Sequence, residues 1–298
     1  MTAPSRATLA GRAYLDLRTK ARADGRPVDE LLHLYVLEAF LARLAMSRFA
    51  DQLVLKGGVL LAAFGERRPT RDIDLQAQTL DNDAQIVRTV VCEIAGIGKD
   101  DGVLFDVASA TAAVIRDEDA YTGVRVTLAT QLATARPHFH VDVNVGDPIT
   151  PAPEAVRIPR LLGGEVVVRG YPLPMVHAEK IVTAVIRGTL STRWRDFADM
   201  YLLTRHHSVG GAELARSIRE VARHRQVQLR ALAEVLDGFG AMAQPRWAAW
   251  RRKQQLEDRL PAQFDEVVSA VITFADPAIG EAVDGRSWLP ASGRWAYG

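Results

Sequence analysis

The stretch from Leu53 to Leu75, LVLKGGVLLAAFGERRPTRDIDL, constrains the fold more than any other part of the chain. Leu53 to Leu55 has the length of a buried strand, and the glycine pair Gly57-Gly58 ends it. Val59 to Phe64 then predicts a short apolar helix. A glycine pair between a strand and a helix lets the backbone approach a ligand closely, and free N–H groups at the start of a helix suit a phosphate.

An Asp-x-Asp pair, Asp72 and Asp74, follows this helix. Residues two apart in a strand point to the same side, so both carboxylates share one face while Ile73 and Leu75 enter the core. Two like charges held side by side are costly unless a cation lies between them. The pair is therefore a candidate site for a divalent metal ion.

Composition excludes several classes of protein. The chain has 298 residues, of which 48% are hydrophobic and 24% charged, as is typical of a globular protein with one large or two modest domains. The net charge of +1 means that any site for a polyanion must be a local patch. The single cysteine, Cys92, excludes an internal disulfide and fits a reducing compartment. No apolar run reaches the ~18 residues of a membrane span and no signal peptide is visible, so we expect a cytoplasmic protein without a membrane partner.

Helical patterns flank the opening stretch. Apolar spacing predicts a surface helix from about Leu9 to Ala23 and a long amphipathic helix from Asp29, its expected N-cap. Another helix is predicted over 81–98, with Cys92 as a small core residue. Between Gly102 and Pro148, short alternating runs of β-branched residues predict neighbouring strands of one sheet.

The segment from His138 to Asp147 alternates between apolar and polar residues, which predicts a strand with one buried face. Two interpretations of Asp142 stay open. It lies on a polar face turned to water, or it is a third carboxylate that converges with Asp72 and Asp74 if the two strands are neighbours. We expect His138 and His140 to be surface residues rather than metal ligands.

A proline-rich segment predicts a domain boundary near Pro151, which gives expected domains 1–150 and 151–298. A hairpin is predicted over 157–171, followed by helices at about 174–187, 194–203, 211–224, 228–238, 245–258 and 262–275. From Arg187 to Arg259, fourteen arginines and lysines outnumber eight acids, with Trp247 and Trp250 among them. Such a basic region with aromatic residues suits RNA, and a solvated helical face explains the same excess equally well.

The predicted elements have the layout expected for transfer of a nucleotidyl group from a nucleoside triphosphate. Two divalent ions about 4 Å apart can activate an attacking hydroxyl and stabilise the leaving pyrophosphate. Carboxylates are the hard ligands that Mg²⁺ prefers. We therefore expect two Mg²⁺ ions, held by Asp72, Asp74 and Asp142, with an NTP as the substrate.

The same residues resemble a known family. The thirteen residues between Gly58 and Asp72 give the spacing of the glycine-pair to acidic-pair signature of the DNA polymerase β nucleotidyltransferase superfamily. The Arg-x-Thr-x-Asp-Ile-Asp-Leu block, Glu179-Lys180 and the later segment RDFADMYLL resemble the AbiEii/AbiGii-type toxins, including the MenT toxins of mycobacteria. The resemblance covers roughly residues 50–205. It implies an α/β (α+β) nucleotidyltransferase fold with a mixed sheet, and a mostly helical C-terminal domain that completes the active site.

The resemblance also implies roles for individual residues. Gly57 and Gly58 would hold the triphosphate, and Asp72 and Asp74 would bind Mg²⁺. Asp142 matches the third carboxylate, which would activate the acceptor 3′-hydroxyl.

Further positions match the family's cationic and acidic residues. Lys180 matches the lysine that reaches the nucleotide, and Asp196 matches the acid of the Arg/Lys-Asp-x-x-Asp motif. Asp199, on the same helix face, is an alternative to Asp196 or a surface acid. The cations near the glycine and acid pairs would neutralise phosphate oxygens, or are solvated surface residues: Lys56, Arg68 and Arg71.

Thr70 projects on the same face as the acid pair and has two interpretations. It is a turn or strand-capping hydroxyl, or a phosphoacceptor through which an antitoxin silences the enzyme. A phosphate there would add about two negative charges beside the carboxylates.

The function implied is that of a toxin that adds nucleotides to the 3′ end of tRNA and so blocks aminoacylation and translation. Its partners would be the tRNA acceptor end and a cognate antitoxin. Three alternatives are a small-molecule nucleotidyltransferase of the antibiotic-modifying kind, an Asp-x-Asp glycosyltransferase and a non-catalytic regulatory protein. The glycine block placed before the acids disfavours the glycosyltransferase.

Overall fold

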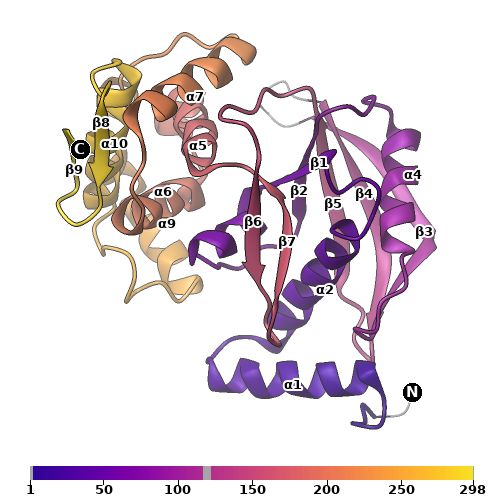
Figure 1. Ribbon diagram of the computed structural model, residues 1–298. Helices are drawn as coiled ribbons and strands as arrows, with labels where there is room; N and C mark the ends of the chain where they lie inside the picture. The colour runs from indigo at the N-terminus through magenta and orange to yellow at the C-terminus, as the bar shows by residue number, and fades with distance from the viewer. Residues whose placement is uncertain (1–2, 117–121, 298) are drawn as a thin grey trace. The chain divides into compact units, whose positions relative to one another are not determined.

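The computed structural model describes residues 3–116 and 122–297 (Figure 1). The chain divides into two compact units. Unit 1 runs to Asp147 and includes Glu154–Gly170, and unit 2 holds Pro148–Pro153 and the chain from Tyr171 onward. The sequence predicts strands across residues 117–119, and that part of the prediction lies outside the described residues.

Within the described part of unit 1, seven strands form one mixed sheet in the order β3-β4-β5-β2-β1-β7-β6. The pairs β2/β5 and β1/β7 are parallel, and the other neighbours are antiparallel. The strand with Asp142 lies beside the strand with Asp74, which is the condition set for Asp142 to converge with the acid pair. The hairpin of β6 and β7 follows the expected boundary near Pro151 and adds to this sheet. The strands are β1 (Leu53–Lys56), β2 (Ile73–Ala77), β3 (Val103–Arg116), β4 (Thr122–Leu132), β5 (His138–Val145), β6 (Glu154–Pro159) and β7 (Glu165–Gly170).

One face of this sheet is apolar and is covered by helix α2. Phe40 of α2 packs on Phe139 of β5, with 5.1 Å between ring centroids, and on Phe105 of β3 at 6.2 Å. Ile73 and Val141 are fully buried, as their alternation predicts. The opposite face carries the polar members of the same strands. The helices of unit 1 are α1 (Leu9–Ala23), α2 (Val28–Leu44), α3 (Gly57–Leu60), the 3₁₀ helix η1 (Leu61–Phe64) and α4 (Ala84–Ala95).

Local signals set some of the helix ends in unit 1. The Asp83 side chain caps α4 by accepting hydrogen bonds from the backbone N–H groups of Gln85 and Ile86, at 2.8 and 2.9 Å. Gly65 closes η1 in the left-handed conformation, with φ of 76°. The prediction that Asp29 caps α2 was wrong, because α2 begins at Val28 and Asp29 lies in its first turn. There its charge still favours the helix N-terminus.

Unit 2 is mostly helical, as the sequence predicts, and it ends in a short hairpin that the sequence analysis did not predict. Its aromatic core includes Trp247, which is fully buried, stacks on Phe264 at 4.7 Å and donates from Nε1 to the Pro261 carbonyl. Trp247 therefore offers no exposed ring for stacking on RNA bases. Among the described residues, no helix has the length and hydrophobicity to cross a bilayer. The elements are α5 (Leu173–Arg187), η2 (Gly188–Leu190), α6 (Trp194–His206), α7 (Gly211–His224), α8 (Leu232–Val235), α9 (Phe239–Lys253), α10 (Phe264–Ile279), β8 (Arg286–Leu289) and β9 (Arg294–Tyr297).

Candidate functional site

Four ionic residues form a row across the middle strands of the sheet in unit 1. The register places Lys56 of β1 opposite Asp74 of β2, and Asp74 opposite Asp142 of β5. Arg125 of β4 lies opposite Asp142. Residues paired across neighbouring strands project on the same face about 5 Å apart. These residues, which we call the charged row, therefore alternate as cation, acid, acid and cation on the polar face.

The two acids of the Asp-x-Asp pair lie at the start of β2. Asp74 belongs to the charged row, and Asp72 directly precedes the strand, with its Oδ1 3.4 Å from the Thr70 hydroxyl that donates to it. Both acids are half-buried, whereas Asp142 is 7% exposed. Over residues 3–116 and 122–297, no group of three or more His, Cys, Asp or Glu side chains is placed to hold a metal ion. The structure thus brings the three predicted carboxylates onto one face without making them a common ligand set.

Arg125 engages both oxygens of Asp142. Its Nε donates to Oδ1 at 2.7 Å and its Nη2 donates to Oδ2 at 2.6 Å, which is a bidentate pair. The hydrogen bond to Asp142 raises the pKa of Arg125 against the opposing effect of partial burial, and the charges of Asp72 and Asp74 add to the rise. The sequence analysis missed Arg125. Its position in an alternating run was visible, but its partner depends on the register between β4 and β5.

The glycine pair lies directly against the acids. Gly57 has φ of 66°, and a Cβ there would lie 1.8 Å from Oδ2 of Asp74. A Cβ at Gly58 would lie 2.6 Å from the Thr70 hydroxyl and 3.2 Å from Nη1 of Arg68. Position 57 therefore requires glycine, because its backbone is packed against the predicted metal-binding carboxylate, and a side chain at Gly58 would displace Thr70.

Lys56, at the end of β1, has an acidic partner that the sequence analysis missed. Its Nζ lies 3.6 Å from Oδ2 of Asp147, and the two side chains are only 10% and 6% exposed. The charge of Lys56 is thus balanced within the sheet face.

The segment that leads into the acid pair is held by α2. The His33 Nε2 donates to the Arg71 carbonyl at 2.7 Å, and the Arg71 side chain is exposed. Burial lowers the pKa of His33, which favours the neutral ring. Thr70, in the same segment, is only 7% exposed. His33 was also missed, because nothing in the sequence pairs residue 33 with residue 71.

Lys180 and its two acids form a separate ionic cluster in unit 2. The Lys180 Nζ of α5 donates to Asp196 and to Asp199 of α6, at 2.8 Å in both cases. Arg193 also donates to Asp196, from Nε at 2.8 Å. The structure therefore brings Lys180, Asp196 and Asp199 into one cluster and gives both acids the same partner. The roles that the resemblance implies for these residues stay a prediction. The cluster belongs to unit 2 and the charged row to unit 1.

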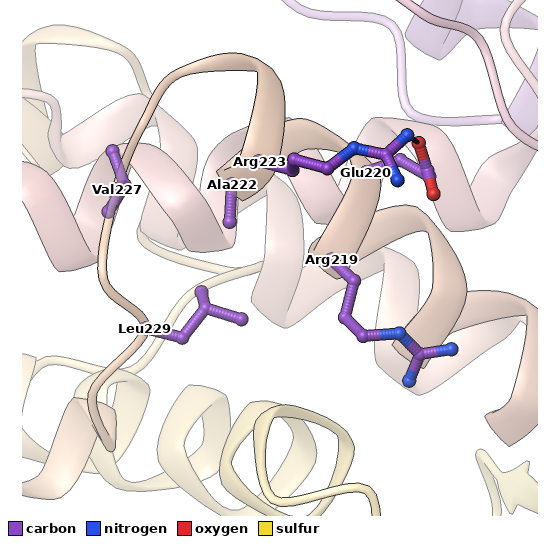
Figure 2. Close-up of a pocket in the computed structure, with 6 residues that line it drawn as sticks. All are labelled: Arg219, Glu220, Ala222, Arg223, Val227 and Leu229. Atoms are coloured by element: carbon purple, nitrogen blue, oxygen red, sulfur yellow. Dashed lines mark hydrogen bonds and ion pairs between the residues drawn. The ribbon is translucent and has the colours of Figure 1, made fainter.

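Unit 2 also has an open pocket of about 370 Å³ beside α7 (Figure 2). Arg219 pairs with Glu281 at 3.1 Å, and Arg223 pairs with Glu220, so both guanidinium groups have acidic partners. None of the predicted site residues lines the pocket, and we assign it no ligand. It is lined by Arg219, Glu220, Ala222, Arg223, Val227 and Leu229.

Two solved structures from Helicobacter pylori are similar to this chain. A candidate nucleotidyltransferase matches with a TM-score of 0.51 and 13% identity, over 85% of this chain and 97% of that one. The protein JHP933 matches with a TM-score of 0.50 and 14% identity, over 85% and 94% of the two chains. At such low identity these similarities show a shared fold. A sequence comparison with curated proteins gives no match.

Family comparison gives a more specific result. The model described as "Nucleotidyl transferase AbiEii toxin, Type IV TA system" matches residues 39–270. The match covers most of the chain and includes the glycine pair, the charged row and the Lys180 cluster. The chain therefore belongs to the AbiEii family of nucleotidyl transferase toxins from Type IV toxin–antitoxin systems.

Proposed function

We propose that this chain is a Mg²⁺-dependent nucleotidyltransferase that adds nucleotides from an NTP to the 3′ end of tRNA. The contact between the Asp74 carboxylate and the Gly57 backbone carries the proposal. It joins the two features that the reaction needs, a backbone open to a triphosphate and carboxylates able to bind its counter-ion. Blocking the acceptor end would stop aminoacylation and hence translation, in the cytoplasm where tRNA is used.

The residues at the start of β2 fit one Mg²⁺ ion. Mg²⁺ is commonly held by one or two carboxylates together with substrate phosphates and water, which Asp72 and Asp74 could provide with the NTP. When bound, the ion would neutralise charge on the triphosphate and on the leaving group. Metal ligation by Asp142, and with it a second ion, stays a prediction. The bidentate pair that Arg125 forms with Asp142 disfavours it.

The proposed reaction exchanges one phosphoester linkage for another. The acceptor 3′-oxygen forms a bond to the α-phosphorus, the bond from that phosphorus to the bridging oxygen breaks, and pyrophosphate leaves. The hydroxyl proton passes to a base, for which Asp142 is the predicted residue. Lys56, Arg68 and Arg71 are the cations proposed to balance phosphate charge. Lys180 is proposed to reach the nucleotide, and Asp196 to act as the acid of the Arg/Lys-Asp-x-x-Asp motif, as the resemblance implies.

The direct test incubates the purified chain with each α-labelled NTP, MgCl₂ and total tRNA. We expect label on tRNA for the parent protein and its loss in Asp74→Ala, with Lys180→Ala strongly reduced. Asp51→Ala, which changes an exposed acid before β1, is the matched control and should label like the parent. Persistent labelling by Asp74→Ala, or no labelling by the parent with any of the nucleotides, would contradict the proposal.

The acceptor is tested in the same assay. Periodate oxidation of tRNA destroys the terminal diol and should abolish labelling. An aminoglycoside added in place of tRNA should stay unlabelled. A labelled aminoglycoside with unlabelled tRNA would favour a small-molecule nucleotidyltransferase instead.

We further propose that the antitoxin silences the enzyme by transferring the γ-phosphoryl group of a nucleoside triphosphate to the Thr70 hydroxyl, with the nucleoside diphosphate as the leaving group. The Thr70 hydroxyl lies against Gly58 and 3.4 Å from Asp72, so a phosphate there would compete with the triphosphate. Because Thr70 is only 7% exposed, modification requires the segment before β2 to open. Intact-mass analysis after co-expression should show a phosphate on the peptide that contains Thr70. An unmodified peptide from silenced toxin would exclude this mode of control.

A further inference from the structure

Arg125 stands at the end of the charged row where the predicted third metal ligand lies. The Arg125 side chain is 39% exposed, while the Asp142 side chain beneath it is 9% exposed, so the guanidinium covers the carboxylate from the solvent side. Both Asp142 oxygens accept hydrogen bonds from it, at 2.7 and 2.6 Å. The strand register fixes this geometry, because Arg125 and Asp142 are directly paired across β4 and β5.

The charges of the row show what this guanidinium does. At the other end, Lys56 is already engaged by Asp147. Arg125 is therefore the cation that balances Asp142, and its pKa is raised mainly by that hydrogen bond, with further contributions from Asp72 and Asp74. It supplies at Asp142 the positive charge that a second divalent ion would otherwise supply. An ion bound there would have to displace the guanidinium or lie beside a like charge, and both are unfavourable.

We propose that Arg125 is a positioning residue that keeps Asp142 out of the metal ligand set, so that the free protein binds a single divalent ion at Asp72 and Asp74. This inference rests on the proposed function, which assigns the metal to the acid pair. It deepens that function by fixing the number of ions and the role of the third carboxylate. Asp142 is then an acid that Arg125 orients on the polar face, separate from the metal.

Metal binding tests this without any turnover. The free protein is titrated with Mn²⁺, and unbound Mn²⁺ is followed by its electron paramagnetic resonance signal. The parent should bind one ion, Asp74→Asn should lose it, and Asp142→Asn should bind it as the parent does. Arg125→Ala should bind a second ion, or bind Mn²⁺ about tenfold more tightly, because it frees a carboxylate and removes a like charge.

The sheet offers a matched control for the arginine. Arg157 of β6 pairs with Glu165 of β7 across neighbouring strands at the other side of the sheet. Arg157→Ala should leave Mn²⁺ binding unchanged. Arg125→Lys serves as a second variant if Arg125→Ala folds poorly. It keeps the charge while losing the two-point contact, and should still bind a single ion.

Several results would overturn the inference. The first two are two Mn²⁺ ions bound by the parent and an equal loss of Mn²⁺ binding in Asp142→Asn and Asp74→Asn. The others are Mn²⁺ binding by Arg125→Ala that equals the parent's, and no Mn²⁺ binding by any variant. The double variant Arg125→Ala with Asp142→Asn should lose the gain, since the freed carboxylate is its source. The tRNA assay separates this inference from the proposed function. Labelling by a parent that binds two ions refutes the inference alone, and a parent that binds one ion without labelling tRNA refutes the function alone.

Discussion

The described residues of unit 1 include two bidentate arginine–aspartate pairs whose surroundings differ. Arg43 donates to both oxygens of Asp101, at 2.6 and 3.2 Å, and Arg125 does the same to Asp142. The Arg43 side chain is 3% exposed, whereas that of Arg125 is 39% exposed. Arg43 also donates to the carbonyls of Ala39, Ile97 and Val103. Among the described residues, the hydrogen bonds of Arg125 go to Asp142 alone.

The difference separates a structural pair from one that is available to chemistry. Arg43 lies over the Phe105 ring at 5.0 Å and ties α2 to the segment that enters β3, so its guanidinium has no donor left for a ligand. Arg125 uses one edge of its guanidinium and turns the rest to the polar face. The same kind of arginine–aspartate pair thus stabilises the fold at Arg43 and orients a candidate catalytic acid at Arg125.

Loss of the buried arginine should have the largest effect. Arg43→Ala leaves the Asp101 carboxylate buried without its charged partner, and we expect a loss of about 3–5 kcal/mol in the free energy of unfolding. Urea unfolding followed by circular dichroism measures it. Arg48→Ala is the control, because Arg48 forms a bidentate pair with Glu93 at the surface and its loss should leave the midpoint unchanged. Equal unfolding midpoints for the two variants would mean that the buried Arg43 pair contributes no more to stability than the surface Arg48 pair.

The charged row can be disturbed from the glycine side. Gly57→Ala places a methyl group against Asp74 at a positive φ. We expect the free energy of unfolding to fall by about 2–3 kcal/mol and tRNA labelling to be lost. Gly65→Ala is matched, because Gly65 also has a positive φ, of 76°, but nothing within 4 Å of its Cβ position. Gly65→Ala should lower the free energy of unfolding by about 1 kcal/mol and leave tRNA labelling unchanged. Equal effects at both glycines would mean that the contact with Asp74 is unimportant.

His177 of α5 sharpens the comparison, because it is a buried titratable group without a hydrogen-bond partner for either ring nitrogen. Burial, aided by the charges of Lys180 and His207, lowers the pKa of His177 to about 3. Between that value and its unfolded pKa of about 6.5, only the unfolded chain binds the proton, so stability falls as the pH drops below about 6.5. At pH 5 the loss should be about 2 kcal/mol.

The measurement for His177 is the unfolding midpoint at pH 5 and pH 7.5. His177→Leu should show a smaller drop at pH 5 than the parent, since the leucine binds no proton. An identical drop in both proteins would show that other groups carry the pH dependence. Arg43 is paired with Asp101 in the core, whereas the His177 ring has no hydrogen-bond partner and burial favours its neutral form.

Much of the site could be predicted because its signals are local. The glycine pair, the acid pair and the alternating strand of Asp142 each follow from residues close in sequence, and β5 does lie beside β2. The partners of these residues could not be predicted. Arg125, Asp147 and His33 acquire their contacts only from strand register and helix packing, which join positions far apart in the chain.

Element boundaries show the same limit. Helix α7 spans Gly211–His224 as predicted, because its apolar spacing is strong. The helix predicted over 228–238 is the four-residue α8. Helix α9 begins at Phe239, earlier than the predicted start at about residue 245, and contains Pro245. Phe239 is buried against Phe197 and Phe264, so tertiary packing extends α9 through the proline. The β8/β9 hairpin is too short to give a periodic signal.

The smallest effect on stability is expected for Arg125. Its pair with Asp142 is partly exposed, so Arg125→Ala should lower the free energy of unfolding by about 1 kcal/mol. This loss is well below the one expected for Arg43→Ala. Added Mg²⁺ should restore more stability to this variant than to the parent, because an ion that binds only the folded state stabilises it and the freed Asp142 provides an additional ligand. Unfolding midpoints with and without 10 mM MgCl₂ measure this. If Mg²⁺ shifts the parent and Arg125→Ala equally, Arg125 does not control access of the metal to Asp142, and the two arginine pairs differ in burial alone.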